Sequence, residues 1–226
     1  MAQQILPPSE SWHLIDAWLA THAASDLALL NPPATPDEIR HAERILGARL
    51  PDDLAESLRC HNGMSAWTTI LPEQSPLTVS GIVDHWQTCV DIAGENEGLT
   101  PRSWEEEPWW HRLWVPWAVS ADGAAQVIDQ RPGPDTGRLG WAGHSGGGDF
   151  TDSWPDLASL LHAVARALHE GGDVHGLRPY LTTQGGMWWD EGGCGELHGH
   201  PLRPAPIGLP RPLADPDHRT AATPQS

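Results

Sequence analysis

The chain has 226 residues, which suits one domain with appendages or two small domains, and this length can bury a core without disulfide or metal support. Thirty acidic residues outnumber thirteen basic ones, and the formal net charge of −17 argues against nucleic acid or an anionic membrane as partner and favours a basic protein. Three widely spaced cysteines exclude a disulfide framework and a zinc knuckle. Because the chain shows neither a signal-peptide pattern nor an apolar run of transmembrane length, we expect a cytoplasmic protein.

The amino-terminal third predicts three helices. The first covers residues 9–22, where apolar side chains recur at helical spacing. The second has a complete start signal, with Thr35 as N-cap, Pro36 at the first helical position and Glu38 closing a capping box, and Gly47 is expected to end it.

The third predicted helix spans residues 51–61 and follows a Gly-x-x-Leu-Pro entry. Leu54 and Leu58 form an apolar stripe one turn apart, which predicts a buried face. Asn62 and Gly63 then supply a left-handed stop.

The rest of the chain alternates between short strands and helices. In order, we expect strand-like pieces over 77–79 and 81–83, a helix over 84–93, a loop over 95–112, strands over 114–119, 126–129 and 139–142, a helix capped by Ser153 and ended by Gly171, and a hairpin over 179–189. Proline, charge and small residues predict a disordered tail over 192–226. The pattern favours an α+β fold, an antiparallel sheet with helices packed on one side.

The order of several short motifs resembles the SUKH superfamily, which contains the fungal Smi/Knr cell-wall regulators and many bacterial toxin-immunity proteins. The matching positions are Leu50-Pro51, His61-Asn62-Gly63, Trp114-Val115-Pro116, Asp122-Gly123, Ile128-Asp129, Pro132-Gly133, Gly137 and Asp152-Ser153. The resemblance extends over residues 9–191. It implies the same α+β fold and a non-enzymatic protein-binding module without cofactor, most often an immunity protein that neutralises a cognate toxin. A regulatory scaffold in cell-wall or growth control is the alternative.

A partner surface is predicted in the loop over 95–112, where tryptophans flank a run of glutamates. Its residues are Trp104, Glu105, Glu106, Glu107, Trp109 and Trp110. Aromatic anchors inside an acidic rim are typical of a binding hot spot for a basic partner, such as a nuclease-type toxin. The competing interpretation is that these tryptophans cover a sheet edge. Six other tryptophans lie on apolar faces and are expected in the core: Trp12, Trp18, Trp86, Trp114, Trp141 and Trp154.

Two further patterns suggest chemistry but lack the context that it needs. Gly143 to Gly147 match the Gly-x-Ser-x-Gly nucleophile elbow around Ser145, yet four residues intervene before the predicted helix, so a hydrolase is only a second alternative. By residue type, a metal could bind His175, Cys194, His198 and His200, of which His198 and His200 lie in the predicted tail. The short spacing and the absence of a second cluster favour surface histidines, and we expect no metal. Oligomeric state is not indicated.

Overall fold

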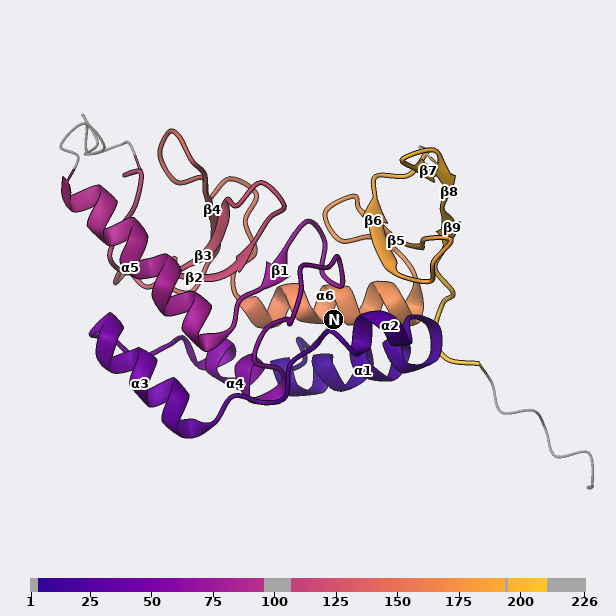
Figure 1. The fold of residues 1–226 in the computed structure, drawn as a ribbon, viewed down its shortest axis with the longest axis horizontal. Helices are drawn as coiled ribbons and strands as arrows, with labels where there is room; N and C mark the ends of the chain where they lie inside the picture. The colour runs from indigo at the N-terminus through magenta and orange to yellow at the C-terminus, as the bar shows by residue number, and fades with distance from the viewer. Residues whose placement is uncertain (1–3, 96–106, 194, 211–226) are drawn as a thin grey trace, which may run out of the picture.

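A four-stranded antiparallel sheet and a smaller three-stranded sheet stand on a layer of helices (Figure 1). The computed structural model describes residues 4–95, 107–193 and 195–210. The helices are α1 (Pro8–His22), α2 (Ala24–Leu27), α3 (Pro36–Leu46), α4 (Asp52–Cys60), α5 (Val79–Glu95) and α6 (Leu157–Glu170). Within the described residues, none of these helices is long and apolar enough to cross a membrane.

The large sheet has the strand order β1-β2-β3-β4, and the small sheet has the order β6-β5-β9. The strands are β1 (Ser75–Pro76), β2 (Trp114–Val119), β3 (Ala125–Asp129), β4 (Leu139–Ala142), β5 (Arg178–Leu181), β6 (Met187–Asp190), β7 (Glu196–Leu197), β8 (His200–Pro201) and β9 (Arg203–Pro204). The pairings in both sheets are antiparallel. This confirms the α+β class predicted from the sequence.

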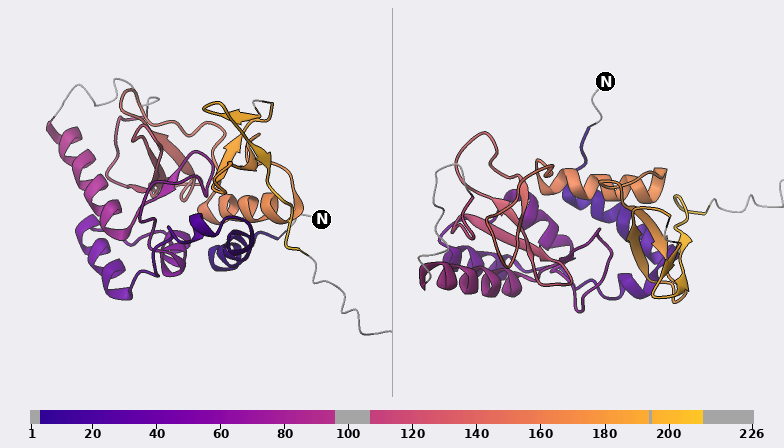
Figure 2. Two further views of the ribbon diagram at one scale, coloured as in Figure 1. Left: turned by 45° about the vertical axis from the view of Figure 1, so that its right-hand side comes forward. Right: turned by 90° about the horizontal axis from the view of Figure 1, so that it is seen from above.

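Helices α1 and α6 lie side by side below the two sheets in Figure 1, and Figure 2 shows the same pairing from two other directions. Both helices are long, and each buries an apolar stripe at helical spacing. Of the six tryptophans predicted for the core, Trp12, Trp18, Trp86 and Trp114 are buried. Trp154 is partly buried and packs against the core, whereas Trp141 is partly buried and is not part of it, so the prediction was wrong for Trp141.

Helix starts follow the sequence closely at α3 and less closely elsewhere. The Thr35–Glu38 capping box forms, and Gly47 ends α3 in the left-handed conformation. Ser153 does not cap α6, because Asp156 does so by accepting a hydrogen bond from the Ser159 backbone N–H at 2.7 Å.

The sequence predicted strand-like pieces over 77–79 and 81–83, but Val79 and residues 81–83 belong to the start of α5, and residues 77 and 78 lie in neither a helix nor a strand. Their β-branched side chains suggested a strand, but Val79, Ile82 and Trp86 recur at helical spacing and all three are buried. Asn62 accepts a hydrogen bond from the Val79 backbone N–H at 2.8 Å and so caps the start of this helix across 17 residues of chain.

The His61-Asn62-Gly63 motif joins three helices. His61 Nε2 lies 2.9 Å from a carboxylate oxygen of Asp16 on α1, while Asn62 caps α5. Gly63 has a φ of +64°, and a Cβ there would lie 2.4 Å from the carbonyl carbon of Leu77. Only glycine fits this close approach, so the motif fixes how α1, α4 and α5 meet.

The chain stays ordered beyond residue 191, contrary to the predicted tail. Strand β9 pairs with β5, and Trp18 Nε1 donates to the Pro206 carbonyl at 2.9 Å. The Gly208 backbone N–H donates to the Leu168 carbonyl, also at 2.9 Å. The partners of these backbone groups lie on α1, α6 and β5, outside the segment itself. Because the composition of the segment does not reveal such partners, it predicted disorder. Residues 211–226 lie outside the described part.

Candidate functional site

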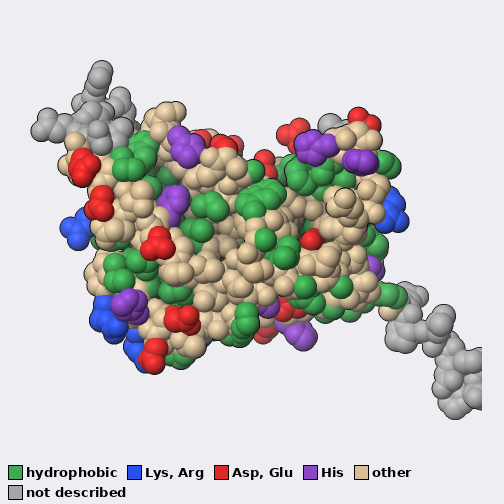
Figure 3. Space-filling model, viewed as in Figure 1, with side chains coloured by type: hydrophobic (Ala, Val, Ile, Leu, Met, Phe, Trp, Pro, Cys, Tyr) green, Lys and Arg blue, Asp and Glu red, His purple; other side chains and the backbone are tan. Residues whose placement is uncertain are grey.

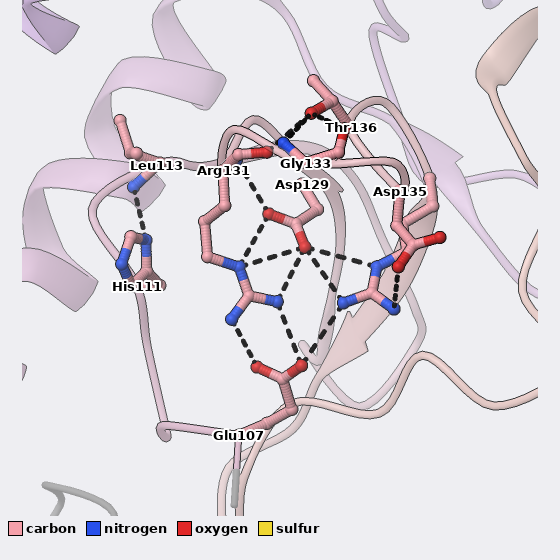
Figure 4. A network of polar contacts seen from close by, with 9 residues as sticks. Glu107, His111, Leu113, Asp129, Arg131, Gly133, Asp135 and Thr136 are labelled. Atoms are coloured by element: carbon pink, nitrogen blue, oxygen red, sulfur yellow. Dashed lines mark hydrogen bonds and ion pairs between the residues drawn. The ribbon is translucent and has the colours of Figure 1, made fainter. Parts of the chain in front are cut away.

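Two arginines and two carboxylates form the densest polar network of the described residues, and Figure 4 shows it at close range. Arg131 contacts Glu107 at 2.7 Å and Asp129 at 2.7 Å. Arg138 contacts the same two carboxylates at 3.3 and 3.2 Å. We call these four residues the arginine cluster.

The arginine cluster is balanced in charge and partly enclosed. Burial raises the pKa of Asp129, but hydrogen bonds from the side chain and backbone of Arg131 outweigh it, so the pKa lies below its ordinary value. The hydrogen bonds that Arg131 donates to Asp129 and Glu107 in turn raise the pKa of Arg131. The cluster therefore holds the segment that enters β2 against the turn between β3 and β4. Its four charged groups form ion pairs with one another.

This network changes the interpretation of the predicted loop surface. The Glu107 side chain is bound inside the cluster, and Trp110 is buried with only 6% of its surface exposed. Trp109 is partly buried, and its indole N–H donates to the His144 carbonyl at 3.3 Å. Glu107 and Trp110 are thus engaged by the protein itself. The remaining three predicted residues, Trp104, Glu105 and Glu106, lie outside the described residues.

A hollow lined by tryptophan lies between the large sheet and the small sheet. Its volume is about 570 Å³, and Figure 3 shows the surface dipping between two lobes, with hydrophobic side chains gathered in the dip. The lining residues are Trp67, Thr69, Glu73, Ser120, Ala121, Asp122, Ala124, Trp141, Leu177, Trp188 and Trp189. We call this hollow the tryptophan groove. Trp67 is 46% exposed, which is unusual for so large an apolar side chain.

The charged residues that line the tryptophan groove are acidic. Glu73 and Asp122 are exposed at its wall, and none of the described lining residues is basic. Hydrogen bonds from the Ser120 hydroxyl and the Ala124 backbone N–H lower the pKa of Asp122, so its carboxylate stays ionised at neutral pH. The groove combines exposed aromatic surface with fixed negative charge.

The small sheet is held against the rest of the molecule by three specific hydrogen bonds. Asp26 accepts from the Met187 backbone N–H at 2.6 Å, and Thr69 donates to the Met187 carbonyl. Trp189 Nε1 donates to the Ile70 carbonyl at 3.1 Å. Because these bonds are buried, they set the position of the groove wall that carries Trp188.

Comparison with known proteins places these features in a family. The model of the SMI1 / KNR4 family (SUKH-1) matches residues 33–162, more than half of the chain. The chain belongs to the SMI1 / KNR4 family. No curated protein matches it.

The family match divides the tryptophan groove into two parts. The large sheet, with Trp67 and Trp141 on its side of the groove, lies within residues 33–162. The wall that carries Leu177, Trp188 and Trp189 lies beyond the matched residues. This SMI1 / KNR4 family member therefore builds the second wall of its groove from residues carboxy-terminal to the family match.

The glycine-rich loop around Ser145 lacks the geometry of a nucleophile elbow. Ser145 is exposed between β4 and Phe150, and the next helix begins only at Leu157. The glycines have a packing reason instead, because a Cβ on Gly147 would lie 2.2 Å from the Glu107 carbonyl oxygen.

The predicted metal-ligand types do not assemble either. Among the described residues no group of three or more His, Cys, Asp or Glu side chains is placed to hold a metal ion. His175 stacks on Trp154 at 4.3 Å, and Cys194 lies outside the described residues. His198 and His200 lie on the exposed turn of β7 and β8.

Sequence reasoning missed the tryptophan groove. Trp67 stands in an irregular segment without periodicity, and Trp188 lies in a hairpin that was predicted without a role. The sequence did contain one signal for an exposed tryptophan, the adjacent pair Trp188-Trp189. Adjacent residues of a strand face opposite sides of the sheet, so the two side chains cannot both enter the same core.

Proposed function

We propose that this protein binds a basic protein partner in the tryptophan groove and acts in the cytoplasm as an immunity protein against a nuclease-type toxin. The observation that carries the proposal is the make-up of the groove, with exposed tryptophan beside carboxylates and no basic side chain among its described lining residues. Family membership supports a protein-binding role of the immunity or Smi/Knr type in general.

The aromatic part of the groove supports binding to a protein. Tryptophan is enriched among residues that dominate binding energy, especially where it lies in a concave, desolvated site. Trp67 and Trp188 are both at least partly exposed, so a partner that covers them gains apolar burial.

The charge supports a basic partner. A nuclease must attract phosphates and therefore carries positive charge around its active site. The ionised groove carboxylates, within a chain of net charge −17, complement such a surface and accelerate encounter. We expect the association rate to fall steeply with added salt.

The loop residues Trp104, Glu105 and Glu106 are retained as a proposed second contact, and residues 9–191 as the proposed extent of the family domain. The second groove wall, with Leu177, Trp188 and Trp189, lies within residues 9–191, and β9 pairs with β5 from beyond them.

The proposal is tested by searching the neighbouring genes for a toxin domain and by measuring whether this protein protects cells that express that domain. Wild type is expected to restore growth, whereas Trp67→Ala/Trp188→Ala is expected to fail although it accumulates to the same level. The matched control is Ile45→Ala, which removes another exposed apolar side chain, 39% exposed on α3.

Protection by the double variant equal to that of wild type would overturn the groove as the binding site. If the partner proves to be a cell-wall or growth regulator and no neighbouring gene encodes a toxin, the regulatory scaffold replaces the immunity role.

A further inference from the structure

A second hollow continues from the tryptophan groove, and the two share Glu73, Trp141 and Leu177. Its volume is about 160 Å³, several times what one water molecule needs. Gln74 and Gln126 line it, and we call it the glutamine cavity.

The two glutamines are buried without a partner for their side-chain oxygens. Gln74 is 3% exposed and Gln126 is 6% exposed. Neither Oε1 atom has a hydrogen-bond donor within reach among the described residues. Buried polar atoms are almost always paired, and leaving an acceptor unpaired is costly. Two such acceptors at one cavity indicate that something outside the described residues supplies the donors.

The sheet register places the acceptors and a carboxylate on one surface. Gln126 lies directly opposite Trp141 across β3 and β4, and Trp141 lies opposite Asp149 through an isolated bridge. Residues opposite one another in antiparallel strands share a face of the sheet. The row therefore contains an amide, an indole ring and an exposed carboxylate, all of which line the cavity.

The donors required here have a defined chemistry. The cavity is lined by the two glutamine side chains, by the carboxylates of Asp149 and Asp152, and by the rings of Trp141 and Trp154. The last torsion angle of a glutamine side chain has a broad distribution. Rotating the amide group by half a turn exchanges its oxygen and nitrogen and directs the oxygen to the cavity. A guanidinium group matches this set because it is planar, has five donors and stacks on aromatic rings. An ammonium group has three donors and does not stack as a plane.

We propose that the glutamine cavity receives an arginine side chain of the protein partner, with Gln74 and Gln126 accepting hydrogen bonds from its guanidinium group. This rests on the proposed function, since it names the residue that anchors the partner beside the tryptophan groove. The backbone flanking that arginine then lies across Trp67 and Trp188, and the wall carboxylates exclude acidic side chains.

The test uses the full chain and three short probes that differ in one side chain, acetyl-Gly-Arg-Gly-amide, its lysine analogue and its citrulline analogue. Citrulline keeps the shape of arginine but carries no charge. In ¹H–¹⁵N spectra, the arginine probe is expected to shift the indole resonances of Trp141 and Trp154, and to bind about tenfold or more tightly than the other two probes.

The deciding variant is Gln74→Met/Gln126→Met, which keeps side-chain volume and removes both acceptors. It is expected to weaken the arginine probe about tenfold or more without loss of thermal stability, because two unpaired buried acceptors are removed. Equal binding of arginine and citrulline by wild type, or unchanged arginine binding by the variant, overturns the proposal. A large loss of stability in the variant also overturns it, because the amides must then be paired within the protein.

Failure of this inference can be separated from failure of the proposed function. If Trp67→Ala/Trp188→Ala abolishes protection against the toxin while the glutamine variant protects fully, the groove binds the partner and the arginine anchor is wrong. If neither variant changes protection, the tryptophan groove is not the binding site, and the arginine anchor beside it is wrong as well.

Discussion

The arginine cluster and the tryptophan groove both involve the large sheet. Their polar groups differ in whether they have partners within the protein. In the cluster, each carboxylate of Asp129 and Glu107 contacts both arginines, and the charges cancel. In the groove and its adjoining cavity, no lysine or arginine is among the described lining residues, and two buried amide oxygens lack donors. The first arrangement stabilises the fold, and the second leaves interactions for a partner to complete.

This contrast explains why an acidic, tryptophan-rich segment is a poor guide to a binding surface by itself. Glu107 and Trp110 have the residue types of a hot spot, but the fold uses one in an ion-pair network and the other in the core. Trp67 is isolated in the sequence and remains 46% exposed. What distinguishes a binding residue here is the absence of an internal partner, which only the structure reveals.

The largest expected effect comes from breaking the arginine cluster. Asp129→Asn removes a nearly buried charge that contacts both arginines, and we expect it to lower the free energy of unfolding by about 3 kcal/mol. Urea denaturation followed by tryptophan fluorescence measures this. Asp135→Asn is the matched control, because its side chain is 67% exposed and 3.9 Å from Arg138. Equal losses in both variants would show that the cluster is not structural.

The pH dependence of the same variant sharpens the point. Since folding lowers the pKa of Asp129, its stabilising contribution is present above the unfolded pKa of about 3.9 and is lost as pH falls through the lower folded value. The stability difference between wild type and Asp129→Asn should therefore be constant from pH 7 to pH 5 and shrink below about pH 4. A difference that stays undiminished as pH falls below the unfolded pKa of about 3.9 would contradict the ion-pair explanation.

Weakening the attachment of the second groove wall should lower the free energy of unfolding by a smaller amount. Asp26→Ala leaves the Met187 N–H without its acceptor and should cost about 1–2 kcal/mol in unfolding free energy. Burial raises the pKa of Asp26, so its stabilising effect is complete below the unfolded pKa and is lost as pH rises through the folded value. Asp26→Asn keeps an acceptor without the buried charge and should match or exceed wild-type stability at pH 7. Equal destabilisation by both substitutions would refute this.

The smallest effect is expected in the glutamine cavity, and it has the opposite sign. Single substitution Gln126→Met should raise the free energy of unfolding by up to about 1 kcal/mol, because an unpaired buried acceptor is removed. Differential scanning calorimetry should show a small increase in melting temperature. Gln130→Met, at a partly exposed position just after β3, is the control and should change little. A clear decrease for Gln126→Met would mean that its amide is already satisfied.

The fold was more predictable than the site, for a physical reason. Thr35, Glu38 and Gly47 determine the ends of α3 through local hydrogen bonds and backbone conformation, and such local signals are legible in the sequence. Asn62 capping α5 and Trp18 holding residue 206 are contacts across many residues, and neither leaves a local pattern. The groove lies between two sheets that are far apart in the sequence and adjacent in the fold, so no single segment predicts it.

The central claim is that the tryptophan groove, rather than the loop residues Trp104, Glu105 and Glu106, supplies most of the binding energy. Calorimetry with the proposed toxin partner tests it directly, by comparing Trp67→Ala/Trp188→Ala with Trp104→Ala/Glu105→Gln/Glu106→Gln. We predict that the groove variant raises Kd about 100-fold, in keeping with the loss of aromatic hot spots, and that the loop variant raises it about threefold at most. The reverse order, or an unchanged Kd for the groove variant, would contradict the claim.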